Sequence, residues 1–272
     1  MALITISHSM GSGGMSIARR VAETLNLELY DDQRLREQAV TMGIQSEDLI
    51  GLYEKKPGFF DRLLSSKPEA YKDLMESVVY QVSREGAGVI IGHGSQVLLQ
   101  AFGCALHVLV HASEPYRIQN IMKHQKLDRE SAQRLIRKSD HEKGGFFRFA
   151  FNQDWDDPAI YDLIINAEKI GMDAAAKIII ETAQLDEIKT CSLTALETIE
   201  KLSQQRLILA ALAKYNLNRT LLNVDVPEKG AVVIRGFTYS EADKQQAVQI
   251  VKAVPGISDV QSEISVIPSQ VD

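Results

Sequence analysis

The chain has 272 residues, more than one domain of ordinary size contains, so two folded units are expected. Hydrophobic residues make up 45% of the chain and charged residues 24%, a composition that excludes an intrinsically disordered protein. The net charge of −6 argues against the basic surface with which proteins bind duplex nucleic acid.

The first predicted elements are a strand, a glycine-rich loop and a helix. Residues 2–7 form a short apolar and β-branched run, and three glycines follow it within residues 8–15. From Ser16 onward, apolar residues recur at helical spacing. Residues 27–30 then predict a second short strand.

The middle of the chain alternates between helical and strand patterns. Residues 33–85 are predominantly helical, and the runs 88–92 and 105–110 suit strands that are buried on both faces of a parallel sheet. The later segments are a charge-rich helix over 114–143, an irregular aromatic-rich stretch over 144–158, a strand over 161–167 and a helix over 172–183. This alternation predicts an α/β fold with right-handed crossovers.

A smaller α+β unit is predicted after a boundary within residues 184–194. Its pattern is a helix over 196–215, strands over 222–227 and 231–236, a helix over 240–254 and a strand over 260–267. The predicted division is a first domain over 1–185, a linker over 186–198 and a second domain over 199–268.

Neither the cysteines nor the N-terminus carries a recognisable motif. Cys104 and Cys191 lie far apart and match no metal-binding or CxxC spacing, so both are expected to be buried free thiols. The N-terminal segment lacks the pattern of a signal peptide, and no apolar run approaches the roughly 20 residues that a membrane-spanning helix needs. A cytoplasmic protein is the expectation.

The glycine-rich loop has the sequence context of a phosphate-binding loop. Glycines between a strand and a helix let backbone N–H groups at the helix N-terminus surround phosphate oxygens. A standard Walker A loop begins with glycine and ends in Gly-Lys followed by Ser or Thr, but His8 stands here at the first position and Gly14 at the lysine position. A strand-to-helix turn that binds nothing is the alternative.

Four segments in order resemble one family. They are ISHSMGSGGMSIARRVAETLNLELYDD, GVIIGHGSQVLL, ALHVLVHASEPYRIQNIM and RKSDHEKGGFFRFAFNQDWDDPAIYDLIINAEKIGMDAA. The first resembles the N-terminus of the cytidylate kinase-like family, a branch of the P-loop nucleoside monophosphate kinases whose GSGG loop itself lacks the lysine. The resemblance covers about residues 2 to 185 and implies a parallel sheet flanked by helices, with a helical lid.

The resemblance implies ATP-dependent phosphoryl transfer to a nucleoside monophosphate, with CMP or dCMP favoured and Mg²⁺ as cofactor. In such a reaction the protein mainly positions the groups and neutralises charge. The implied ATP-binding residues are Ser9, Met10, Gly11, Ser12, Gly13, Gly14, Met15 and Ser16, with the Ser16 hydroxyl facing the metal. The implied acceptor-binding residues are Asp31, His93, Arg117 and Asp140, and the implied catalytic cations of the lid are Lys143, Arg137 and Arg148.

The sequence departs from the family at four cation positions. Arginine is usual in the family where this chain has His8, Met15, His93 and Lys143. Arginine offers a planar fork of donors that lysine and histidine do not reproduce. A catalytically weakened nucleotide sensor is therefore an alternative to an active kinase.

The C-terminal unit resembles a BON domain. The resemblance rests on the strand AVVIRG at 231–236 and on VPGISDV at 254–260. It implies a small interaction module with a protein or membrane-surface partner, and a third hypothesis is that the whole chain is an adaptor that acts through this module. No nucleic-acid polymer is expected as a partner.

Overall fold

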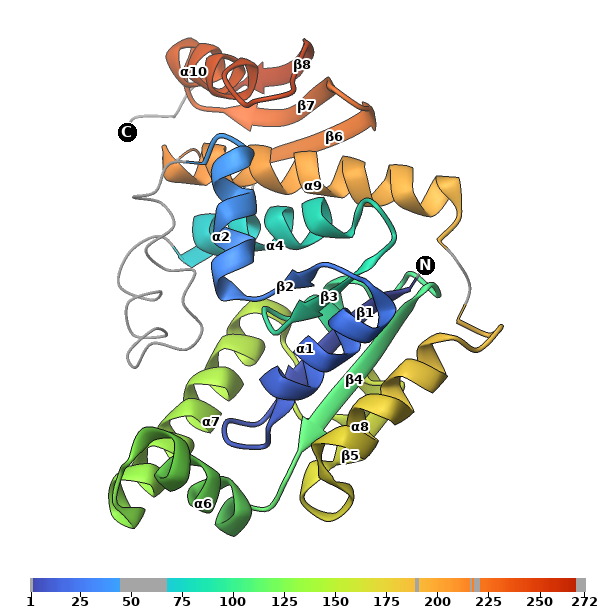
Figure 1. Ribbon diagram of the computed structural model, residues 1–272. Helices are drawn as coiled ribbons and strands as arrows, with labels where there is room; N and C mark the ends of the chain where they lie inside the picture. The colour runs from blue at the N-terminus through green and yellow to red at the C-terminus, as the bar shows by residue number, and fades with distance from the viewer. Residues whose placement is uncertain (1, 45–67, 189–190, 216, 218–220, 268–272) are drawn as a thin grey trace.

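A five-stranded parallel sheet and a separate three-stranded sheet organise the chain (Figure 1). The computed structural model describes residues 2–44, 68–188, 191–215, 217 and 221–267. The first sheet has the order β2-β3-β1-β4-β5. Its strands are β1 (Leu3–His8), β2 (Leu29–Tyr30), β3 (Gly88–Ile91), β4 (Ala105–His111) and β5 (Leu163–Asn166). The predicted α/β fold with a second, smaller α+β unit is confirmed.

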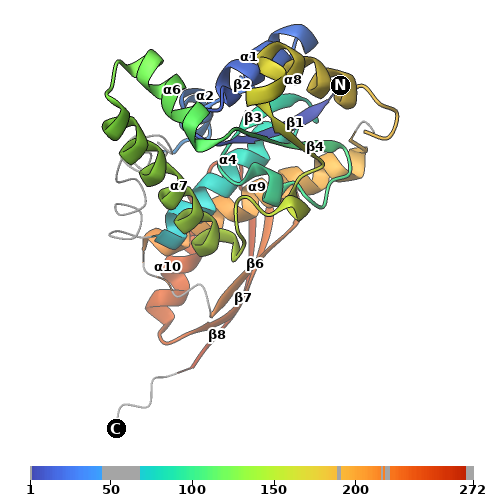
Figure 2. The ribbon, with the colours of Figure 1, turned by 90° about the horizontal axis from the view of Figure 1, so that it is seen from below.

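Side chains on the two faces of the first sheet enter two different hydrophobic clusters. Leu3 belongs to one cluster, and its neighbours Ile4 and Ile6 point to the other. Helices α1 (Gly14–Leu25) and α8 (Ala167–Ala183) cover the second face, as Figure 2 shows. Because both faces are covered, the central strands are continuous apolar runs, as the sequence pattern indicated.

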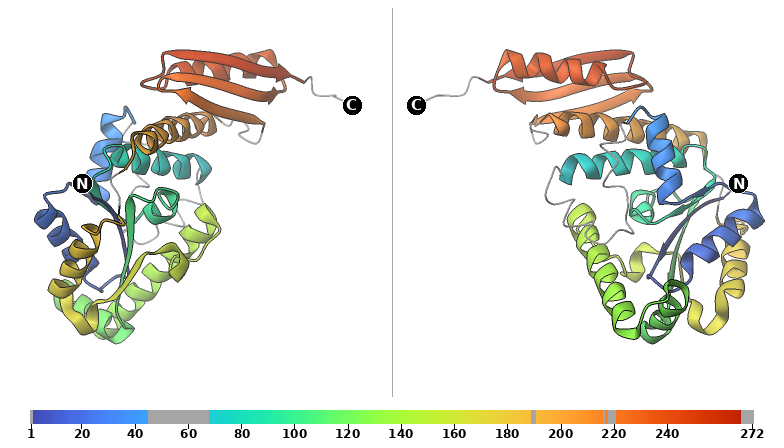
Figure 3. Two further views of the ribbon diagram at one scale, coloured as in Figure 1. Left: turned by 90° about the vertical axis from the view of Figure 1, so that its right-hand side faces the viewer. Right: turned by 60° about the vertical axis from the view of Figure 1, so that its left-hand side comes forward.

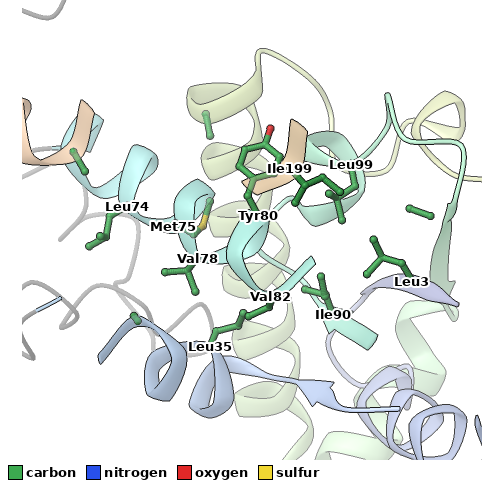
Figure 4. Packing of buried hydrophobic residues seen from close by; sticks show 14 of the residues in the cluster. Leu3, Leu35, Leu74, Met75, Val78, Tyr80, Val82, Ile90, Leu99 and Ile199 are labelled. Carbon is green, nitrogen blue, oxygen red and sulfur yellow. The ribbon is translucent and has the colours of Figure 1, made fainter. Parts of the chain in front are cut away.

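The other face of the sheet is covered by α4 (Pro68–Ser83), by the short α5 (Ser95–Leu98) and by the C-terminal half of α7 (Arg129–Phe151). Figure 4 shows Met75 and Val78 of α4 in the same packed cluster as Leu3 and Ile90 of the sheet. The helix α2 (Asp32–Thr41) also packs against α4. Part of the predicted helical region, residues 45–67, lies outside the described residues.

The predicted helical segment over 114–143 consists of two helices, α6 (Glu114–Gln125) and α7. Lys126 adopts a left-handed conformation that ends α6, and the Asp128 carboxylate accepts a hydrogen bond from the Ser131 N–H at 2.9 Å to begin α7. The predicted irregular stretch over 144–158 was wrong for its first half, since α7 continues to Phe151. Phe147 and its aromatic neighbours stay helical because they pack into the core.

Helix α9 (Leu193–Lys214) lies between the two sheets and contacts both units (Figures 1 and 3). Ile199 packs with α4, whereas Ile208 and Leu212 pack against the second sheet. The helix runs unbroken from residue 198, where the predicted linker ends, to residue 199, where the predicted second domain begins. The division of the chain at that point stays a prediction.

The second sheet has the order β6-β7-β8. Its elements are β6 (Leu222–Glu228), β7 (Ala231–Thr238), α10 (Glu241–Lys252) and β8 (Asp259–Val266). Alternate residues such as Val224 and Ile234 face α9 and α10, and their intervening neighbours on β6 are exposed. This alternation is typical of a sheet with one covered face.

The expectation that Cys104 and Cys191 are free thiols was wrong, because the two form a disulfide with a Cα–Cα distance of 4.9 Å. Cys104 immediately precedes β4, and Cys191 lies just before α9. The docking of α9 on α4 therefore brings together two cysteines that are 87 residues apart. None of the helices in the described part of the chain is long and apolar enough to cross a membrane. The cytoplasmic location stays a prediction.

Candidate active site

The loop between β1 and α1 forms a cradle that requires glycine at two positions. Gly11 has φ of 84° and Gly13 φ of 90°, both in the left-handed region. A β-carbon would lie 2.8 Å from the Arg117 carbonyl oxygen if added at Gly11 and 2.8 Å from the Met172 sulfur if added at Gly13. The loop is therefore tightly enclosed by α6 and α8.

The N-terminus of α1 opens into this loop without a capping side chain. Gly13 is the N-cap residue, and the first turn contains no acidic residue. Gly13 has no side chain with which to cap the first amides of the helix, and these amides together with the helix dipole favour an anion. This arrangement fits the phosphates of a nucleotide. Ser16 lies in the exposed first turn, and its role toward a metal stays a prediction.

Other loop residues have structural contacts. The Ser12 hydroxyl donates to the Val110 carbonyl oxygen at 3.2 Å and is fully buried. The Ser9 N–H donates to the same carbonyl at 3.1 Å. Met10 packs among the apolar residues of α6 and α7, and Met15 packs at the edge of the cluster beneath α1. These contacts fix the loop to β4 and to the helices α6 and α7, which correspond to the lid implied by the resemblance and are called the lid below.

Three side chains of α6 and α7 donate hydrogen bonds to carbonyl groups of the loop. Lys143 Nζ donates to the His8 oxygen at 2.7 Å, and Asn120 Nδ2 donates to the Gly11 oxygen at 2.9 Å. Arg117 donates to the Met10 oxygen at 3.4 Å. The lid therefore contacts the loop directly.

Arg117 and Asp140 form a bidentate ion pair, with N–O distances of 3.0 and 2.8 Å. The Arg117 side chain is 10% exposed. Both residues were predicted to bind the acceptor, and here each binds the other at the edge of the loop. The Lys143 ammonium also lies 4.9 Å from the centre of the Trp155 ring, within the range of a cation–π contact.

Asp31 and His93, the other two predicted acceptor residues, lie at the ends of neighbouring strands. The Asp31 carboxylate caps α2 by accepting hydrogen bonds from the Gln33 and Arg34 N–H groups at 3.1 and 3.0 Å. His93 is 1% exposed, and its Nε2 lies 3.0 Å from an Asp32 carboxylate oxygen. The buried acid at the strand end is therefore Asp32, which we did not single out from the sequence.

The two remaining predicted lid cations lie on the surface. Arg137 is 67% exposed and pairs with Glu114 at 3.2 Å, and Arg148 is 59% exposed and pairs with Asp154 at 3.3 Å. A hydrogen bond from Gln133 and the nearby Arg137 lower the pKa of Glu114. In the part of the chain that the structure describes, Lys143 is the one of the three predicted catalytic cations that donates a hydrogen bond to the loop.

The described residues contain no group of three or more His, Cys, Asp or Glu side chains that could hold a metal ion. A magnesium ion at this site would therefore depend on phosphate oxygens and water for most of its ligands, as Mg²⁺ commonly does in kinases.

Comparison with known proteins places two families along the chain. The model of the cytidylate kinase-like family matches residues 3–169, and that of the BON domain matches residues 203–268. A cytidylate kinase of Pyrobaculum islandicum is 26% identical over 179 residues, which cover 65% of this chain and 90% of the relative. A cytidylate kinase of Archaeoglobus fulgidus is 27% identical over 188 residues, covering 68% and 97%.

A solved structure of an uncharacterised protein from Eubacterium ventriosum superposes with a TM-score of 0.54. The two sequences are 22% identical, and the match covers 67% of this chain and 97% of the other. At this identity the similarity concerns the fold alone.

Proposed function

Because the chain belongs to the cytidylate kinase-like family, we propose that it transfers a phosphoryl group from ATP to a nucleoside monophosphate, with CMP or dCMP the favoured acceptor. The observation that supports this most strongly is the glycine loop at an uncapped helix N-terminus, at the carboxyl end of the central strand β1. Ligands of open parallel sheets bind at this edge. The relatives named above are cytidylate kinases, which favours a pyrimidine acceptor.

On the donor side, the loop from Ser9 to Ser16 binds and orients the phosphates of ATP. Mg²⁺, when bound, neutralises part of the phosphate charge, with Ser16 as the proposed protein ligand. Because Gly11 and Gly13 have no side chains, the main chain of the loop can approach the phosphates closely.

On the acceptor side, the proposed site lies where β2 and β3 end. Asp31, Asp32 and His93 come from these strand ends, and Arg117 with Asp140 borders the loop. An acceptor between them would lie next to the donor phosphates, as in-line transfer requires. Arg137 and Arg148 could serve the transferred phosphoryl group only if the lid moves, since each is paired with a surface acid here.

The test is ADP release measured by a coupled assay over a panel of nucleoside monophosphates, with ATP and Mg²⁺. We expect CMP or dCMP to accelerate ADP release most strongly, and omission of Mg²⁺ to abolish the acceleration. If no monophosphate accelerates ADP release, the proposed transfer is wrong.

A nucleotide sensor is the second candidate, and one observation favours it. Helix α9 joins the core of the kinase-like unit to the BON-like unit, so a change in one unit has a direct path to the other. ATP that raises the melting temperature of the protein, with no turnover of any monophosphate, would support this candidate over the kinase.

A further inference from the structure

In this loop the first position of the Walker A pattern bears a side chain, and the lysine position bears none. The Walker A pattern has glycine first and lysine after its last glycine. Here the first position is His8 and the lysine position is Gly14. A β-carbon on Gly14 would overlap the His8 side chain. While His8 is present, the loop therefore has no room for a lysine of its own.

An ammonium group nevertheless reaches the loop from another element. Lys143 Nζ lies 2.7 Å from the carbonyl oxygen of His8, the last residue of β1, where the loop begins. The Trp155 ring supports the same ammonium from another side, at 4.9 Å. A cation is therefore held at the mouth of the phosphate cradle, and no carboxylate of the described residues pairs with it.

The helix that bears this lysine is firmly positioned. Asp140, three residues earlier and on the same side of α7, is tied to Arg117 by two hydrogen bonds, and Phe146 and Phe147 are buried in the core. The lysine therefore points at the loop because α7 is fixed on both sides of it.

We propose that Lys143 supplies, from the lid, the phosphate-binding ammonium that a Walker A loop carries within itself. This inference depends on the proposed function, because it assigns the group that the cation binds to the β- and γ-phosphates of ATP. The cation leaves the His8 carbonyl and contacts a phosphate when the triphosphate enters. Binding of ATP is thereby coupled to the release of the contact between Lys143 and the His8 carbonyl.

The protein contains a natural reporter for this step, since Trp155 is its single tryptophan. Moving the ammonium from the indole ring to a phosphate changes the surroundings of that ring. Titration of the full-length protein with ATP should therefore change the tryptophan fluorescence. The titration should change it much less in Lys143→Met, in which the ring has no ammonium partner to lose.

Calorimetry on the same proteins measures the affinity. Loss of a charge-assisted contact predicts ATP binding that is weaker by roughly 10- to 100-fold in Lys143→Met. Lys143→Gln keeps a hydrogen-bond donor but no charge, so it should show the same loss if the charge matters and wild-type affinity if the side chain only supports the loop. Lys138→Met is the matched control, because Lys138 is on the same helix and pairs with Glu142 on its own helix at 3.7 Å.

Returning the lysine to the loop is the sharper test. The triple variant His8→Gly, Gly14→Lys, Lys143→Met removes the overlap and restores the Walker A arrangement, so it should recover ATP affinity. Gly14→Lys alone should lower the melting temperature, because the new side chain meets His8.

The outcomes separate the two proposals. If the wild-type protein binds no ATP, the proposed function is wrong and the inference with it. If the wild type binds ATP and transfers phosphate while folded Lys143→Met and Lys143→Gln both bind ATP as tightly as wild type, only the inference is overturned.

Discussion

The contact between the loop and the lid differs sharply from the junction between α4 and α9. At the loop, half-buried side chains such as Lys143 and Asn120 each donate one hydrogen bond to a carbonyl group. At the junction, Arg206 of α9 pairs with Asp73 and Glu76 of α4, which are 0% and 2% exposed. The first kind of contact can be exchanged for a ligand, whereas the second is shielded from water.

The junction also has apolar and covalent components. Ile199 is fully buried beside α4, the Ser203 hydroxyl donates to the Ser77 carbonyl at 2.9 Å, and the disulfide ties the chain just before α9 to the start of β4. Helix α9 therefore belongs structurally to the kinase-like unit as well as to the BON-like unit. The comparison indicates that the junction contributes mainly to the stability of the fold, whereas the contacts between the loop and the lid can be replaced by a ligand.

The largest effect on stability is expected from Arg206→Met. Removing the guanidinium from two buried carboxylates should lower the free energy of unfolding by roughly 3–5 kcal/mol, measured by chemical denaturation. Lys229→Met is the control: Lys229 pairs with Glu200 at 2.7 Å but is 67% exposed, so its loss should cost less than about 1 kcal/mol. Equal effects in the two variants would contradict a buried junction.

Loss of the disulfide should have the next largest effect. A bridge that closes a loop of this length typically contributes about 2–4 kcal/mol, mainly by restricting the unfolded chain. The double variant Cys104→Ser, Cys191→Ser should show this loss relative to the oxidised wild type. Reductant should destabilise the wild type and leave the variant unchanged. A reductant effect on the variant would point to another cause.

The first sheet contains a buried histidine, His107 of β4, that should make the free energy of unfolding depend on pH. Burial lowers the pKa of His107, whose Nδ1 lies 2.8 Å from the Thr5 hydroxyl, below its usual value near 6.5. As the pH falls, His107 therefore binds a proton more readily in the unfolded chain than in the folded chain. Below about pH 6.5, this single histidine should reduce the free energy of unfolding by at most about 1.4 kcal/mol per pH unit.

The control for this pH effect is a variant without the imidazole. His107→Asn should have a shallower decline in the free energy of unfolding between pH 7 and pH 5.5 than the wild type. Parallel profiles for the two proteins would assign the decline to other groups.

The smallest effects on stability are expected for the surface cations of the lid. Arg137→Ala and Arg148→Ala should each change the free energy of unfolding by less than about 1 kcal/mol, because both ion pairs are exposed. If these residues serve the transferred phosphoryl group, kcat should fall while the melting temperature stays near that of the wild type. An unchanged kcat would remove them from the proposed machinery.

The loop was predictable from sequence because its signal is local. Glycines between a buried strand and a periodic helix leave few alternatives, and the positive φ angles of Gly11 and Gly13 agree with that pattern. Asp32 was not predicted because it follows Asp31 directly at the end of the strand. Which of the two acids caps α2 and which faces His93 depends on the direction of the chain at that point.

The junction was not predictable from sequence because its signals are distant in the chain. Residues 73 and 206 become partners only when α9 docks, and the same is true of Cys104 and Cys191. The extension of α7 was hidden by Gly144 and its neighbouring glycine, which weaken a helical pattern that core packing of Phe147 restores.

Calorimetric titration of the full-length protein with ATP and Mg²⁺ tests the central claim most directly, namely that a loop without its own lysine binds the triphosphate. The account predicts saturable binding to the wild type and to Gly171→Val, a control at positive φ with open space around it, and no binding to Gly13→Val. Absence of binding to the wild type, or equal binding to Gly13→Val, would contradict it.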